Sequence, residues 1–238
     1  MIRMIKKVNC KNMIQLKICL AKGQYDEEKG GMLMEQEQIG EVIFDNVSLV
    51  QVNGGRIVVG GTKTTVDLKY EKKIQNGSKR NVRIGNCKDE SGAAIFSMEE
   101  YFHTKKAFLF IRTGYPYFML KDNSNNKTYR VDDITFGSDM HYYYIRNEQE
   151  KLIAAIYKPY KKIGEDEYHI YATEDELERM LYFLITYVDF FFYPYNSEHH
   201  YDIDEANDDA AYDISDEELL SIYDKDFIGR VILDEKNM

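Results

Sequence analysis

The chain has no tryptophan, only three prolines and only three cysteines among its 238 residues. So little proline, beside 15 glycines, excludes a collagen-like or proline-rich protein. Three cysteines, an odd number without metal-ligand spacing, argue against a disulfide framework. Familiar catalytic motifs are missing too, because the chain has no glycine-rich phosphate loop, no G-x-S-x-G and no Cys–His motif. These absences favour a non-enzymatic cytoplasmic protein without a cofactor.

The residues that are abundant are aromatic and charged. Twenty tyrosines and 12 phenylalanines favour sheet-rich packing. The net charge of -10 is concentrated at one end, since residues 198–238 hold 14 acidic and 3 basic residues. We therefore predict a nearly neutral domain, residues 1–195, followed by an acidic C-terminal tail, residues 196–238. A dedicated nucleic-acid-binding protein normally has a net basic domain, so no nucleic-acid partner is expected.

Short apolar runs separated by turn residues extend through most of the domain. Residues 13–20 alternate between apolar and polar side chains, which is typical of a strand with one buried face. Asn53-Gly54 and Asn76-Gly77 each lie between apolar runs and predict tight hairpin turns. The regular spacing of such signals from residue 41 to residue 172 predicts an antiparallel sandwich or barrel.

One segment is helical instead. Thr173 and Glu176 form a predicted capping box at its start. From Met180 to Tyr193 only Thr186 and Asp189 are plainly polar, so the helix is either buried in the protein or spans a membrane. The short length and the buried charge favour a core helix, and no transmembrane span is expected. We expect Asp189 to meet a basic or hydroxyl partner near a barrel mouth.

Residues 97–193 combine Tyr101-Phe102, Thr104-Lys105-Lys106, tyrosine-rich hairpins and Ile156-Tyr157-Lys158-Pro159 with this apolar helix. The pattern resembles the tubby C-terminal-like fold shared by LURP-one-related proteins and phospholipid scramblases. The resemblance implies a mainly β (α+β) fold, an antiparallel β-barrel of about twelve strands around a hydrophobic helix at about 173–193. Residues 1–96 match only as further strands, and the acidic extension with its short helix has no counterpart. No ligand residue is transferred from the family.

Basic residues gather around two predicted hairpins. The candidate anion- or lipid-binding residues are Lys69, Lys72, Lys73, Lys79, Arg80, Arg83, Lys158, Lys161 and Lys162. Such clusters can bind phosphate or anionic headgroups. Lysines on edge strands also serve simply to prevent aggregation. The sequence therefore favours a binding or scaffold module for an unidentified partner, with a protein at the membrane periphery that binds anionic lipid as the alternative.

A weaker candidate site lies in the acidic tail. His199, His200, Asp202 and Asp204 carry atoms that zinc accepts as ligands, which leaves a metal-dependent hydrolase as a third alternative. A polar loop is the simpler interpretation, because a metal site needs ligands that converge at fixed distances.

The end of the tail has its own apolar residues. A capping box at residues 215–218 predicts a short helix, and Leu219, Ile222 and Phe227 could anchor it to the domain. In one interpretation the tail folds back on a basic face and competes with an anionic ligand. In the other it stays solvated and only keeps the protein soluble.

Overall fold

The computed structural model describes residues 2–9, 13–26, 31–43, 47–48, 51–75, 77–108, 111–136, 140–159, 167–174, 177–192, 221–224 and 226–231. These residues form a mainly β protein with an antiparallel sheet and the helix α1 (Glu178–Phe192). The strands are β1 (Ile2–Asn9), β2 (Met13–Asp26), β3 (Gly31–Ile43), β4 (Val47–Ser48), β5 (Gln51–Val59), β6 (Thr62–Gln75), β7 (Ser78–Lys88), β8 (Ala94–Phe108), β9 (Ile111–Asp122), β10 (Lys127–Phe136), β11 (Met140–Arg146), β12 (Leu152–Pro159) and β13 (Glu167–Ala172).

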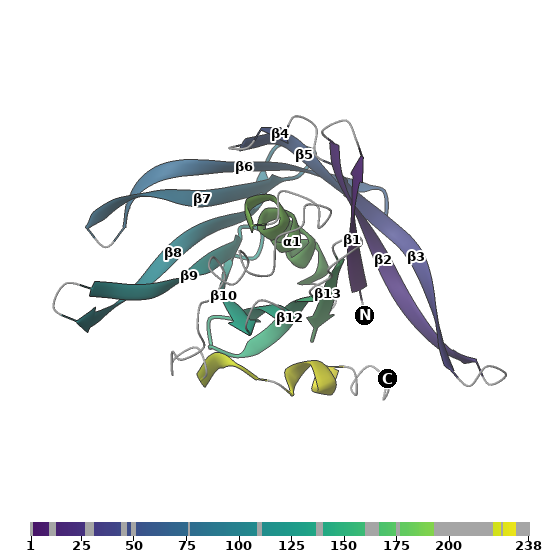
Figure 1. Cartoon of the computed structure of the whole chain (residues 1–238). Coiled ribbons are helices and arrows are strands. Elements are labelled where there is room, and N and C mark those ends of the chain that lie inside the picture. Colours follow the sequence, from purple (N-terminus) through teal and green to yellow (C-terminus); the bar gives the residue numbers. More distant parts are fainter. Residues whose placement is uncertain are drawn as a thin grey trace.

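Strands that follow one another in the chain are mostly neighbours in the sheet, so the backbone forms a meander (Figure 1). The order is β3-β2-β1-β13-β12-β11-β10-β9-β8-β7-β6-β5-β4, with antiparallel pairing throughout. Two pairings join strands that do not follow one another in the chain. β1 pairs with β13, and β3 pairs with β5 from Gly40 opposite Val59 to Ile43 opposite Arg56. The predicted mainly β, antiparallel fold is confirmed.

The two Asn-Gly sequences have different structures. Between β6 and β7 the predicted turn is present: Gln75 pairs with Ser78, and Gly77 has φ +74°, a conformation that glycine adopts without strain. The turn predicted at Asn53-Gly54 is wrong, because β5 continues through it. The register of β5 against β6 shifts between Val52 and Gly55, so the extra residues form a bulge within one strand.

The helix begins later than the sequence suggests. The Thr173 hydroxyl was expected to cap the helix, but it donates to the carbonyl of Ile153 on β12, at 3.1 Å. The Thr173 N–H donates to the same carbonyl, so this residue extends the β12–β13 ladder and α1 starts at Glu178. No helix in the described part of the chain is long and apolar enough to cross a membrane.

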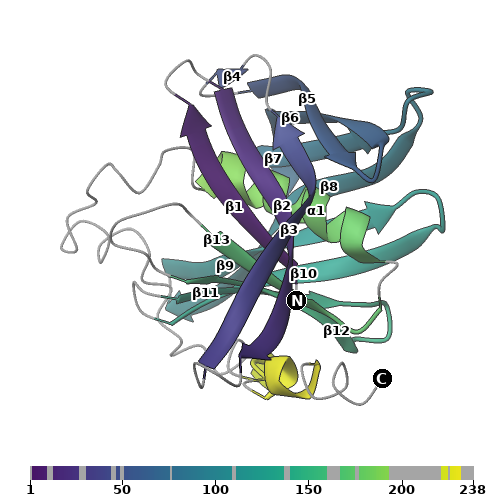
Figure 2. The ribbon, with the colours of Figure 1, turned by 90° about the vertical axis from the view of Figure 1, so that its right-hand side faces the viewer.

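The apolar helix forms the centre of the packing. Every side chain from Met180 to Phe191 is buried. One cluster of buried residues contains α1 together with side chains from β3 and from β5 to β13. Figures 1 and 2 show α1 between β6–β9 and the strands β1, β2 and β13. The alternation of β6, where Val66 and Leu68 are buried and Asp67 is not, explains how each strand presents one face to the helix.

The C-terminal end of the described chain lies on the other face of the sheet, next to β12 (Figure 1). Residues 227–231 form a short helical turn. As predicted, Ile222 and Phe227 contact the body, whereas Leu219 lies outside the described residues. The expectation that this contact uses a basic face is wrong. The residues beneath it are apolar and aromatic, among them Ile134 and Tyr144.

Candidate functional site: the basic hairpin of β6 and β7

Strands β6 and β7 form a long hairpin that projects to one side of α1 (Figure 1). The two strands are paired from Thr65 opposite Lys88 to Gln75 opposite Ser78. The other edge of β7 pairs with β8 only between Ile84 and Lys88 among the described residues. Beyond this stretch the outer part of the hairpin contacts β8 through side chains instead, and cross-strand pairs decide which side chains share a face.

All six of the predicted basic residues between 69 and 83 lie on this hairpin, but three of them have partners on or near the sheet. Lys73 Nζ is 2.6 Å from the Glu99 carboxylate, and the Arg83 guanidinium is 2.5 Å from that of Glu100. The guanidinium of Arg80 lies over the ring of Phe102, 4.7 Å from its centre. The Glu99 hydrogen bond raises the pKa of Lys73, which keeps this side chain positively charged. These three cations stabilise the hairpin.

The exposed face of the hairpin combines cations with apolar groups. Lys69, Lys72 and Lys79 are exposed. Ile74, which pairs directly with Lys79, is 78% exposed, and Tyr70 is 37% exposed. Because side chains two residues apart point the same way, Lys72 lies on the same face as Ile74 and Tyr70, and Lys69 lies on the opposite face. An exposed isoleucine between two lysines at a hairpin tip is the main feature of this candidate site.

The base of the hairpin is held by a group of polar contacts at the end of α1. The Arg83 N–H donates to the Glu100 carboxylate at 3.2 Å, and the Tyr187 hydroxyl of α1 donates to the Arg83 carbonyl at 2.9 Å. At the other end of the hairpin, next to the turn, the Gln75 amide donates to the Glu100 carbonyl of β8 at 2.7 Å. Burial disfavours the charge on Arg83, but Glu100 and Tyr70 outweigh it, so the pKa of Arg83 is raised. The Arg83 guanidinium also lies over the ring of Phe192, at 4.4 Å.

Sequence reasoning found the basic residues of this hairpin and missed its apolar ones. The sequence analysis did not single out Ile74, although an isoleucine next to a predicted turn and close to lysines can be recognised from the sequence. The acidic partners Glu99 and Glu100 come from β8 and could not be assigned from the sequence. Their position follows from the pairing of β7 with β8, which places Ile84 opposite Glu99.

Lys158 does not belong to a surface anion site, and its placement there is wrong. It is buried, 9% exposed, and its Nζ lies 5.8 Å from the centre of the Tyr168 ring. Ile156, two residues earlier, belongs to the central cluster, so the alternation of β12 turns Lys158 inwards as well. The Tyr168 hydroxyl donates to the Asp189 carboxylate at 2.8 Å, which confirms the predicted hydroxyl partner of Asp189. Lys161 and Lys162 lie outside the described residues.

The candidate metal ligands His199, His200, Asp202 and Asp204 also lie outside the described residues. Within the part that the structure describes, no three His, Cys, Asp or Glu side chains are grouped so that they could hold a metal ion.

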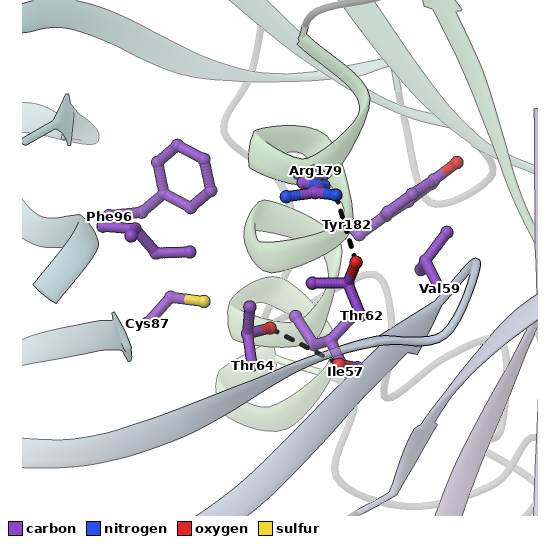
Figure 3. Close-up of a pocket in the computed structure, with 9 residues that line it drawn as sticks. Ile57, Val59, Thr62, Thr64, Cys87, Phe96, Arg179 and Tyr182 are labelled. Carbon is purple, nitrogen blue, oxygen red and sulfur yellow. Dashed lines mark hydrogen bonds between the residues drawn. The ribbon is translucent and has the colours of Figure 1, made fainter. Parts of the chain in front are cut away.

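A small cavity lies near the start of α1, beside the first residues of β6 (Figure 3). Its volume is about 10 Å³, and a single water molecule needs about that much space. Arg179 donates to the Thr62 hydroxyl at 3.4 Å on one side of it. On the other side lies Cys87, whose pKa burial raises to about 11, so its thiol stays protonated and unreactive at neutral pH. This cavity is too small for a ligand, and the β6–β7 hairpin is the stronger candidate.

The fold and this surface define the chain as a mainly β protein with a projecting basic hairpin. Comparison with protein-family models, with curated proteins and with solved structures found no match for it.

Proposed function

We propose that this protein is a non-catalytic binding module in which the sheet closes into a barrel of the tubby-like type around α1. Two observations support closure. β3, at one end of the strand order, pairs with β5, which is next to the other end. In addition, every side chain from Met180 to Phe191 is buried. In this proposal residues 1–195 are the barrel domain and residues 196–238 are its extension.

The ligand that fits the hairpin best is an anionic membrane surface on the cytoplasmic side. The observation that carries this assignment is the exposed face of the hairpin, where Ile74 lies between Lys72 and Lys79 with Tyr70 nearby. Isoleucine can enter the interface, and lysines meet the lipid phosphates. A soluble anion would use the lysines but would leave Ile74 in water.

The expected affinity is modest. A lysine near an anionic surface contributes about 1 kcal/mol. Full burial of an isoleucine contributes about 1.5–3 kcal/mol. Part of this gain is offset by the loss of freedom on binding. The protein should therefore associate reversibly with anionic membranes, and added salt should weaken the association because it screens the lysines.

Vesicle flotation tests this proposal. The intact protein should float with phosphatidylcholine vesicles that contain phosphatidylserine at about 0.05 M salt, and much less at about 0.5 M salt. Lys72→Glu changes the local charge by two units, so binding should weaken about thirtyfold at about 1 kcal/mol per charge. Ile74→Ser should weaken binding while the dependence on salt remains.

Lys69→Glu is the matched control. It makes the same change of charge on the same hairpin, but on the face opposite Ile74, so its effect should be clearly smaller. Absence of flotation by the wild-type protein at low salt would refute the membrane assignment. Equal losses of vesicle binding for Lys69→Glu and Lys72→Glu would show that only the overall charge of the hairpin matters, and would refute a binding site on the face that carries Ile74.

A further inference from the structure

A second surface of the molecule is covered by the chain's own C-terminal segment, residues 221–231. The side chains of Phe227 and Val231 are 4% and 5% exposed. They lie on the outer face of β10–β13, in a cluster with Ile134, Tyr144, Ala155 and Tyr171. Figure 1 shows this segment next to β12, away from the β6–β7 hairpin. This face therefore binds an apolar helical turn.

The segment has the local structure of a small capped helix. The Asp224 carboxylate accepts from the Asp226 N–H at 3.2 Å, and the Asp224 carbonyl accepts from the Phe227 N–H at 3.2 Å. The Arg230 guanidinium forms an ion pair with Asp224 across the turn. Because Phe227 and Val231 are four residues apart, both point to the same side of the turn.

The face supplies one polar contact that matches this shape. The Tyr144 hydroxyl donates to the Asp224 carbonyl at 2.9 Å, just where the helical turn begins. The Tyr223 ring stacks on the Tyr144 ring, with 5.9 Å between centres and 24° between planes. The Tyr142 ring lies 6.1 Å from the same Tyr223 ring. The site thus recognises both the apolar side and the start of the helix.

We propose that this outer face is a docking surface for a short amphipathic helix of a partner protein, and that residues 221–231 occupy it as a tethered competitor. The partner helix has the chemistry of the present occupant: an aromatic residue, a β-branched residue four positions later, and an acidic cap before them. A helical turn of this length has no stability of its own in water. Its order therefore comes from the face it covers, and it can be exchanged for a better ligand.

Because residues 221–231 belong to the same chain as the face, their tethering determines how strongly they compete with a partner helix. A segment tethered to its own binding site acts at an effective concentration on the order of 1 mM. If its intrinsic dissociation constant is about 0.1 mM, it covers the face about nine-tenths of the time. A partner helix then binds about tenfold more weakly than it would to the open face.

The test uses the full chain and a fluorescent synthetic peptide with the sequence of residues 221–231. Fluorescence anisotropy should show weak binding of the peptide to the wild-type protein and about tenfold tighter binding to the Phe227→Ala protein, whose own segment is released. Adding Tyr144→Phe to that protein should weaken binding again, because the ring remains and the donor to the helix start is lost. A peptide carrying Phe227→Ala is the control and should bind neither protein.

Three results would overturn the proposal. One is a folded Phe227→Ala protein that does not bind the intact peptide. Another is unfolding of the sheet, measured by circular dichroism, in both the Phe227→Ala protein and a second variant, Val231→Ala, since the segment would then be an integral part of the fold. The third is a concentration-dependent dimer of the wild-type protein that Phe227→Ala abolishes, because it would assign the face to a second copy of this chain.

Discussion

Replacing Gly85 with alanine should destabilise the protein, because this glycine lets α1 lie directly on β7. A Cβ atom at position 85 would be 2.8 Å from the Tyr187 ring, 3.0 Å from Leu68 Cδ2 and 3.1 Å from Phe183 Cζ. These distances are shorter than ordinary contacts, so at least one neighbour must move. Leu68 and Phe183 are fully buried, and the Tyr187 hydroxyl is held by the Arg83 carbonyl.

Two effects of this substitution oppose each other. Alanine restricts the unfolded chain more than glycine does, which stabilises the folded state by about 0.4–1 kcal/mol. Extra volume in a packed core costs about 1–3 kcal/mol. The crowding should win, because all three neighbours are held within the core. We expect a net loss of up to about 2 kcal/mol, with a fall in melting temperature of about 2–4 °C for each kcal/mol in a protein of this size.

Urea unfolding followed by tyrosine fluorescence and circular dichroism measures the effect. The unfolding midpoint should fall while its dependence on urea stays constant. Gly229→Ala is the matched control, because a Cβ there meets nothing within 4 Å. If Gly85→Ala were as stable as the wild type, the packing of α1 on β7 at this point would be refuted.

Two further predictions concern the core. Leu184→Asp should prevent folding, because Leu184 is fully buried and the new carboxylate would have no partner. Leu184→Ala should still fold, with a loss of about 2–5 kcal/mol in the free energy of unfolding. A Leu184→Asp protein with unchanged circular dichroism and a cooperative melt would contradict a central helix. Stability should also fall in alkali. Burial raises the pKa of Cys87 to about 11 and also raises the pKa values of Tyr144, Tyr182 and Tyr187. In the unfolded chain these pKa values are near 8.5 for Cys and near 10 for Tyr, and below them the buried protonated groups contribute their full stability. This contribution is lost as the pH rises through the pKa values of the folded state. Urea midpoints that stay level from about pH 8 to pH 11 would argue against this burial.

The parts of the structure that the sequence predicted depend on neighbours along the chain. The β6–β7 hairpin is one of these parts, because its turn requires only that Gly77 adopt a positive φ, which glycine does locally. Its basic residues were found together for the same reason. The hydroxyl partner of Asp189 was predicted in kind, since a buried carboxylate needs a donor, but Tyr168 as that donor required the fold.

The second Asn-Gly pair shows where local reasoning ends. Asn53-Gly54 has the same turn chemistry as Asn76-Gly77, yet it forms a bulge within β5. The difference comes from pairing on both sides of it, with Gln51 opposite Lys69 and Gly55 opposite Val66. A partner strand that continues past the pair keeps the chain extended, and the sequence of β5 alone does not contain that partner.

Only the tertiary structure decided which face β12 buries. In Ile-Ala-Ala-Ile-Tyr-Lys, residues 153–158, both faces are nearly equally apolar, so nothing local shows that Lys158 turns inwards and Tyr157 outwards. The same long-range pairing brings Gly85 under α1 and makes an outer face that holds Phe227. Side chains alternate along a strand, so a register set by distant residues decides for every position whether it meets the helix, the C-terminal segment or water. By itself, the sequence determined the strands, the apolar helix and the basic hairpin; how these elements face one another depends on contacts between residues far apart in the chain.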